Sequence, residues 1–117
     1  RMLEVEEYKS FEKELIKVLK TKKIDAILTA NELAAITAIN IVTKLGLSIP
    51  EDVSVIGFTN GLLSMNSNPP LTTISQHGKK MGKLAIQQIF KRIKNRNIEF
   101  KTTVIETTLI KRGSTRN

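Results

Sequence analysis

The sequence lacks cysteine and tryptophan, and its 117 residues include one histidine, three prolines, four phenylalanines and one tyrosine. Without cysteine, disulfides, thiolate zinc sites and thiol catalysis are excluded, which fits a reducing compartment. A single histidine cannot supply a histidine-rich metal site. No apolar run approaches the roughly 20 residues of a membrane helix. These absences predict a cytoplasmic protein that does not span a membrane.

Catalytic motifs are also missing. The sequence has no paired carboxylates in a catalytic pattern, no glycine-rich phosphate loop and no nucleophile beside a base. Its first residues, Arg1 to Glu4, do not form a signal peptide, because an acid appears at once and no apolar segment follows. We therefore expect neither an enzyme nor a cofactor.

The net charge of +8 is spread unevenly along the chain. Residues 1–23 carry seven bases and five acids, residues 24–78 one base and four acids, and residues 79–117 eleven bases and two acids. The C-terminal bases alternate with apolar residues at helical spacing, which is typical of a solvated helix surface. The alternative is a free-standing basic domain that binds nucleic acid through residues 79–101, although no aromatic residues cluster there for stacking on bases.

Along the chain, segments with helical spacing of apolar residues alternate with short apolar runs typical of strands. This alternation predicts an α/β fold with a parallel sheet flanked by helices. Helical spacing is found in three segments: 4–23, 32–45 and 79–94. Strands are expected in five short apolar or β-branched runs: 24–29, 53–58, 71–76, 102–105 and 107–110. Because ligands of such sheets bind at the carboxyl ends of the strands, residues 29–31 and 59–61 are candidate binding segments.

Two segments are more apolar than their elements require. The helix expected at 32–45 has no charge between Glu32 and Lys44, so it needs a cover on two sides: the sheet, and a further layer or a partner subunit. Residues 62–68 are expected to form a loop, yet they include Leu62, Leu63 and Met65. A loop with these apolar side chains is expected to pack on another surface rather than face water.

Four motifs together resemble one family. They are Leu28-Thr29-Ala30-Asn31-Glu32-Leu33-Ala34-Ala35, the run from Leu45 to Phe58, the run from Pro69 to Gln76, and Met81-Gly82. At this spacing the chain resembles the C-terminal part of a LacI/GalR-family transcription regulator. The resemblance implies an incomplete lobe of the periplasmic-binding-protein-like (type I) fold, in which two α/β lobes enclose a small molecule.

The resemblance divides the chain into three parts. It assigns residues 1–76 to the core of the C-terminal lobe, residues 77–106 to a helix and a strand of an N-terminal lobe otherwise outside this sequence, and residues 107–117 to a final strand and tail. The helix-turn-helix domain that would hold operator DNA is not in the sequence either. The helix after His77 would then lack a cover, so we expect it to be displaced, disordered or covered by a neighbouring chain.

The resemblance also implies a function: sensing a small polar effector, a sugar or sugar derivative, in a homodimer that controls an attached DNA-binding domain. It assigns effector contacts to Asn31, Thr59, Asn60 and Gln76. Thr59 stands where the family usually has aspartate, so its hydroxyl offers only a neutral hydrogen bond. For Asn31 the alternative is helix capping, and for Gln76 it is bonding of the backbone at the crossover.

The dimer surface that the resemblance implies coincides with the two segments that are unusually apolar. The residues expected there are Ile36, Leu62, Leu63 and Met65. Physical reasoning and resemblance thus agree on where two copies of the chain meet.

Overall fold

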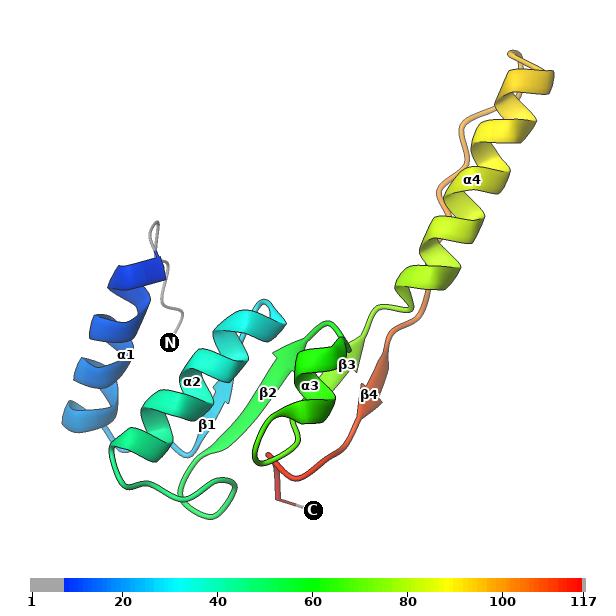
Figure 1. The fold of residues 1–117 in the computed structure, drawn as a ribbon. Helices are drawn as coiled ribbons and strands as arrows, with labels where there is room; N and C mark the ends of the chain where they lie inside the picture. Colours follow the sequence, from blue (N-terminus) through cyan, green and yellow to red (C-terminus); the bar gives the residue numbers. More distant parts are fainter. Residues whose placement is uncertain (1–7, 117) are drawn as a thin grey trace.

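The computed structural model describes residues 8–116, which form a small α/β body with a long projecting arm (Figure 1). The molecule measures 59 × 30 × 20 Å. Its elements are, in chain order, α1 (Tyr8–Thr21), β1 (Ala26–Leu28), α2 (Glu32–Lys44), β2 (Ser54–Phe58), α3 (Leu62–Asn66), β3 (Thr72–Ser75), α4 (Gly78–Lys94) and β4 (Thr108–Ile110). The predicted α/β class is confirmed.

The four strands form one sheet in the order β1-β2-β3-β4. β1 and β3 both pair in parallel with β2, as the sequence predicts, and β4 adds an antiparallel strand beside β3. The three parallel strands therefore end at one side of the sheet. We call this side, with the segments 29–31, 59–61 and 76–77 that leave it, the carboxyl edge.

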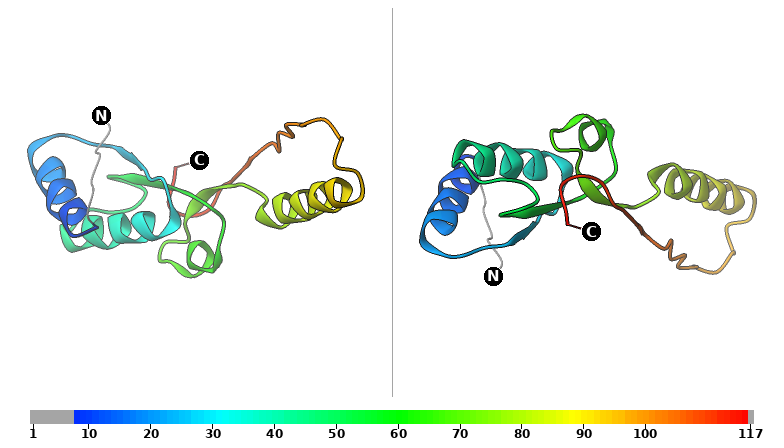
Figure 2. Two further views of the ribbon diagram at one scale, coloured as in Figure 1. Left: turned by 90° about the horizontal axis from the view of Figure 1, so that it is seen from above. Right: turned by 90° about the horizontal axis from the view of Figure 1, so that it is seen from below.

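α2 and α3 lie on the same face of the sheet (Figure 2). The core is found between α2 and this face, where Ala35, Val55 and Leu71 are fully buried. Gly57 allows the close approach, because a Cβ atom there would lie 2.7 Å from Leu71 Cδ2 and 3.2 Å from Ala35 Cβ. Glycine at this strand position thus lets α2 pack directly on β2.

The second side of α2 is covered by α1 of the same chain. Leu15 of α1 belongs to the buried core cluster, and Phe11, Ile16 and Leu19 pack against that cluster. The further layer that the apolar helix requires is therefore present within residues 8–116. Its formation explains why α2 can carry apolar residues on so much of its surface.

The other face of the sheet is open in the described part of the chain. Leu28 and Leu109 are exposed there, and Ile56 and Ile74 are half-buried. The register places these residues side by side, because Leu28 pairs with Ile56 and Ile74 pairs with Leu109. The sheet therefore presents an apolar surface opposite α2.

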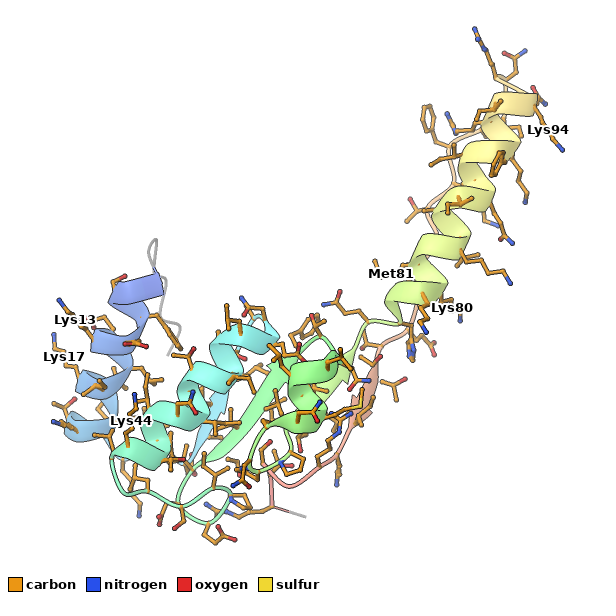
Figure 3. All side chains as sticks on the ribbon, viewed as in Figure 1. Lys13, Lys17, Lys44, Lys80, Met81 and Lys94 are labelled. Carbon is orange, nitrogen blue, oxygen red and sulfur yellow. The ribbon has the colours of Figure 1, made fainter. Side chains whose placement is uncertain are left out.

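The arm consists of α4 and the returning segment 95–107 (Figures 1 and 3). No residue of α4 is buried, and Ile86, Ile89, Phe90 and Ile93 are exposed. Basic side chains follow the helix from Lys80 near its start to Lys94 near its tip (Figure 3). The expectation that its apolar residues lack a cover is confirmed for this structure.

Two local expectations were wrong. Residues 62–66, expected within a loop, form the helix α3. Residues 102–105, expected as a strand, have no strand pairing, because β3 ends at Ser75 opposite Thr108 and the earlier residues extend beyond the sheet. A β-branched run needs a neighbouring strand, and residues 8–116 provide none at that position.

Candidate functional site

The structure brings the sequence-predicted polar residues to one side of the sheet. Asn31 follows β1, Thr59 and Asn60 follow β2, and Gln76 follows β3. Because these strands are adjacent and parallel, all four residues belong to the carboxyl edge. In open α/β sheets this is the side at which ligands bind.

Asn31 has the helix-capping role that the sequence predicts. Its backbone is extended, with φ −152° and ψ 167°, and its Oδ1 accepts a hydrogen bond of 2.8 Å from the Ala34 amide. The side chain is nonetheless exposed at the carboxyl edge. The amide oxygen keeps a second lone pair, so Asn31 can still donate through Nδ2 and accept through Oδ1 when another molecule binds.

Thr59 adopts an unusual backbone conformation for a β-branched residue, with φ 88°. Its N–H donates to the Ile74 carbonyl at 3.0 Å, and its own carbonyl accepts from Thr73 Oγ1 at 2.8 Å and from Ser64 Oγ at 3.3 Å. These bonds hold the strained peptide in place. Strain of this kind is concentrated at functional sites, where surrounding structure imposes it.

Replacing Thr59 with glycine should raise the free energy of unfolding by about 1 kcal/mol, because glycine adopts positive φ without a Cβ penalty. All three backbone hydrogen bonds of residue 59 can persist in this variant. Urea unfolding of the full-length protein checks the value, with Thr59→Ala as the control that removes the hydroxyl but keeps the Cβ. Equal stability of the two variants would show that the backbone at position 59 is not strained.

Glu32 connects α2 to the segment after β2. Its Oε1 accepts from the Gly61 amide at 2.9 Å and from the Ser64 amide at 2.7 Å, and it also accepts from Ser64 Oγ. The N-cap residue of α3, Gly61, has no side chain to cap its helix, so the carboxylate of Glu32 takes that role from across the fold. This contact fixes where residues 59–61 lie relative to α2.

Asn60 is held from the other side by the C-terminal segment. Arg112 Nη2 donates to Asn60 Oδ1 at 2.6 Å, and its Nη1 donates to the Leu71 carbonyl at 2.7 Å. Both acceptors are neutral, and among residues 8–116 the guanidinium has no carboxylate partner. The side chain of Asn60 is therefore hydrogen-bonded to a positively charged group.

Gln76 and His77 mark the point where the chain leaves the sheet for the arm. Gln76 is half-buried. The backbone of His77 is in the left-handed region, with φ 53°. Its Nε2 and Thr108 Oγ1 on the returning strand share a hydrogen bond of 2.8 Å. The single histidine thus joins the two crossing segments.

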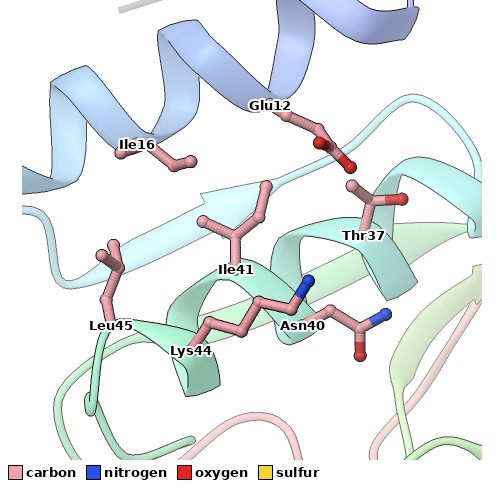
Figure 4. Close-up of a pocket in the computed structure, with 7 residues that line it drawn as sticks. All are labelled: Glu12, Ile16, Thr37, Asn40, Ile41, Lys44 and Leu45. Carbon is pink, nitrogen blue, oxygen red and sulfur yellow. The ribbon is translucent and has the colours of Figure 1, made fainter.

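A hollow lies away from the carboxyl edge, between α1 and α2 (Figure 4). It has a volume of about 150 Å³ and is lined by Glu12, Ile16, Thr37, Asn40, Ile41, Lys44 and Leu45. None of the predicted effector residues lines it. Asn31 and Thr59 are exposed at the carboxyl edge, so enclosing a small molecule there requires a second cover.

The described residues contain neither a candidate metal site nor a membrane-spanning helix. Between Tyr8 and Arg116, no group of three histidine or acidic side chains is arranged to hold a metal ion. Over this range no helix combines the length and apolar character that crossing a bilayer demands.

Three of the predicted interface residues form an exposed apolar surface on α3. Leu62 is 77% exposed, Leu63 50% and Met65 51%. The fourth, Ile36, is instead half-buried and packs against the core cluster. The surface formed by Leu62, Leu63 and Met65 is called the α3 surface below.

Sequence reasoning did not identify Glu32 and Arg112 as residues that position the site. Their partners are 29 to 52 positions away in the chain. No local pattern could have indicated these pairings.

Comparison with known proteins gives a consistent result. A family model described as a periplasmic binding protein-like domain matches residues 3–115. The chain is 34% identical over 103 residues to the HTH-type transcriptional repressor PurR of Aliivibrio fischeri (strain MJ11), an alignment that covers 88% of this chain and 31% of that protein. The chain thus spans about a third of the length of this relative.

Solved structures resemble the fold closely. The lac repressor dimer bound to operator and the anti-inducer ONPF matches with a TM-score of 0.80 at 26% identity, over 91% of this chain and 37% of that one. The complex of the transcriptional regulator CelR with cellobiose matches with a TM-score of 0.83 at 27% identity, over 92% of this chain and 33% of that one. The similarity includes the arm as well as the sheet, since it extends over nine-tenths of the chain.

Proposed function

The chain belongs to the periplasmic-binding-protein-like effector domains of LacI/GalR-family regulators, and we propose that it senses a small polar molecule and controls DNA binding by a domain outside these residues. The observation that carries this proposal is the carboxyl edge. Polar side chains from three parallel strands meet there, and the strained Thr59 peptide is held by bonds from two other elements.

The arm supplies the second part of the proposal. Residues 77–106 leave the sheet at the carboxyl edge and return to it, and their apolar residues are uncovered. We assign this segment to a second lobe, residues 1–76 to the core of the first lobe, and residues 107–117 to its final strand and tail. A molecule at the carboxyl edge would then be enclosed between the lobes at their hinge.

A sugar or sugar derivative is the proposed effector. CelR, a structural neighbour, is seen in complex with cellobiose. Asn31, Thr59, Asn60 and Gln76 offer amide and hydroxyl groups of the kind that bind polyols. Control of DNA binding requires only that the effector prefers one arrangement of the lobes, and no covalent chemistry is needed.

Two copies of the chain would meet through the α3 surface. Exposed leucine and methionine side chains on a short helix are costly in water unless a partner covers them. The matching lac repressor structure is a dimer bound to operator. A homodimer gives each regulator two DNA-binding domains. The arrangement of the lobes in both copies can then set the distance between these two domains.

The test is a thermal-shift screen of neutral and derivatised sugars on the full-length protein, because residues 1–117 contain one side of the site. At least one compound should raise the melting temperature, and the same compound should change affinity for operator DNA. A set of sugars and derivatives without any effect would overturn the carbohydrate proposal.

Substitutions of Asn31 separate its two roles. Asn31→Ala should lower the free energy of unfolding by about 1 kcal/mol, because it removes the cap, whereas Asn31→Ser should keep most of that stability. Both should weaken effector binding by about tenfold, since both remove the amide. Urea unfolding and calorimetric titration measure the two effects, and unchanged binding by Asn31→Ser would restrict Asn31 to capping.

The alternative, direct nucleic-acid binding through residues 79–101, makes a different prediction. It requires the isolated chain to bind DNA with an affinity that falls steeply with salt. Our proposal expects no such binding. A salt titration of residues 1–117 with random-sequence DNA distinguishes the two.

A further inference from the structure

We propose that His77 and Thr108 are positioning residues that hold Gln76 in the proposed effector site. The inference rests on the proposed function and adds to it two residues that act through Gln76. It follows from the hydrogen bonds at the point where the chain leaves the sheet for the arm and returns from it.

Gln76 has a side chain that remains available to a ligand. It directly follows β3 and is half-buried at the carboxyl edge. Within residues 8–116 its side-chain amide has no hydrogen-bond partner, so it can both donate to and accept from a ligand. A long side chain loses conformational freedom when it binds, so the affinity depends on how well its backbone is already placed.

The residue before Gln76 is fixed by the sheet. Ser75 is buried, and it pairs with Thr108 of β4. Its Oγ also accepts a hydrogen bond of 3.4 Å from the His77 N–H, across Gln76. The backbone on the N-terminal side of Gln76 is therefore held by the strand.

The residue after Gln76 is fixed by its own side chain. The backbone of His77 is left-handed, with φ 53° and ψ 50°, at the point where β3 gives way to α4. His77 occupies the N-cap position of α4, yet its side chain makes no capping bond, and its Nε2 is hydrogen-bonded to Thr108 Oγ1 at 2.8 Å instead. Because a hydroxyl can donate or accept, this contact suits either tautomer of the ring.

Both neighbours of Gln76 are thus bound to the same residue, Thr108. Ser75 meets it through strand pairing and His77 through the imidazole. Among the described residues, α4 has no extensive packing contact with another helix or strand, so few other contacts hold this crossing. Without the bond from His77, Gln76 would be fixed on one side only.

Thr108→Val removes the hydroxyl but keeps a β-branched residue, which suits a strand. We expect it to weaken effector binding about fivefold, the effect of one hydrogen bond of ordinary strength. Thr107→Val is the matched control, because Thr107 is exposed and its hydroxyl has no hydrogen-bond partner in the part of the chain that the structure describes. Thr108→Ser keeps the hydroxyl and should bind as the unchanged protein does.

His77→Asn provides a second variant of the same contact. Asparagine tolerates the left-handed backbone, so the substitution removes the ring without imposing new strain. It should weaken effector binding to the same extent as Thr108→Val. Calorimetric titration of the full-length proteins with glucose, ribose and cellobiose measures these affinities.

A double-mutant cycle with Gln76→Ala separates positioning from a general structural effect. If Thr108 acts through Gln76, Thr108→Val should weaken binding by less than about twofold once Gln76 is alanine. NMR relaxation of the backbone amides tests the same point without a ligand. The order parameter of Gln76 should fall from about 0.85 toward the flexible range below about 0.6 in Thr108→Val, but not in Thr107→Val.

The outcomes separate this inference from the proposed function. Equal losses of affinity in Thr107→Val and Thr108→Val overturn the inference, as does a loss in Thr108→Val that persists in full beside Gln76→Ala. Both results leave the proposed function standing, because the protein still binds a sugar. If none of the three sugars binds, an unchanged order parameter of Gln76 in Thr108→Val overturns the inference, whereas the carbohydrate proposal is judged by the wider sugar screen.

Discussion

Replacing Glu32 with alanine is expected to lower the free energy of unfolding by about 3 kcal/mol. The substitution leaves the amides of Gly61 and Ser64 without their acceptor, and each unpaired donor that is partly buried costs about 1–3 kcal/mol. Ser64 is fully buried, so water cannot readily replace the carboxylate there. Urea unfolding of the full-length protein measures the loss.

Two control variants show whether the carboxylate acts through these contacts. Glu32→Gln keeps an acceptor oxygen and should cost about half as much, because bonds to a charged oxygen are the stronger ones. Glu51→Ala removes an exposed acid from the opposite side of the sheet and should change stability by less than about 0.5 kcal/mol. A Glu32→Ala protein as stable as Glu51→Ala would contradict the capping of α3 by Glu32.

Effector affinity should fall in Glu32→Ala more than the stability loss alone explains. Glu32 holds Gly61, and Gly61 directly follows Thr59 and Asn60, which we place in the site. Loosening this segment makes the binding conformation less populated, and the apparent affinity falls by the same fraction. We expect a loss of about tenfold, measured at a temperature where the variant is fully folded.

The dimer is expected to dissociate when a charge is placed on the α3 surface. Leu63→Lys and Met65→Lys each put an ammonium group where the proposed interface excludes water, and an unpaired buried charge is strongly unfavourable. We expect the dimer dissociation constant to rise by about 100-fold, which corresponds to about 2.7 kcal/mol. Sedimentation equilibrium over a range of concentrations checks this.

Asn66→Lys is the matched control for the dimer prediction. It adds the same charge to an exposed position of the same helix without removing an apolar side chain. It should leave the dissociation constant within a factor of about three, provided that the apolar residues form the centre of the interface. An unchanged oligomeric state in both Leu63→Lys and Met65→Lys would place the interface elsewhere.

Ile36 illustrates a limit of the sequence prediction for this interface. Its position in an apolar helix suggested a partner subunit, but α1 and the sheet cover much of that helix, and Ile36 packs against the core. A polar residue there would disturb the fold as well as any dimer. The α3 surface, whose side chains are at least half exposed, is therefore the better place to test association.

The parallel strands and the longer helices could be predicted because their signals are local. Asn31 is expected to cap a helix, and it does, because its Oδ1 reaches an amide only three residues further on. β1, β2 and β3 lie within the predicted apolar runs, and the alternation of strands and helices fixes their parallel order. These features depend on neighbours in sequence, which the sequence displays.

The helix α3 could not be predicted for the opposite reason. Its N-cap position is held by Gly61, which has no side chain, so the expected local cap is missing. The acceptor comes instead from Glu32, 29 positions earlier than Gly61. A segment of glycine, serine and asparagine resembles a loop until the carboxylate of another helix is placed beside it.

The sequence by itself determined the α/β pattern, the family and the segments that leave the carboxyl ends of the strands. It could do so because periodicity, capping and motif spacing are properties of consecutive residues. The tertiary structure alone decided that Glu32 caps α3, that Arg112 donates to Asn60, and that the backbone of Thr59 is held at a positive φ. These contacts join residues that are far apart in the chain, Glu32 to Gly61 and Ser64 and Arg112 to Asn60, so no property of consecutive residues could indicate them.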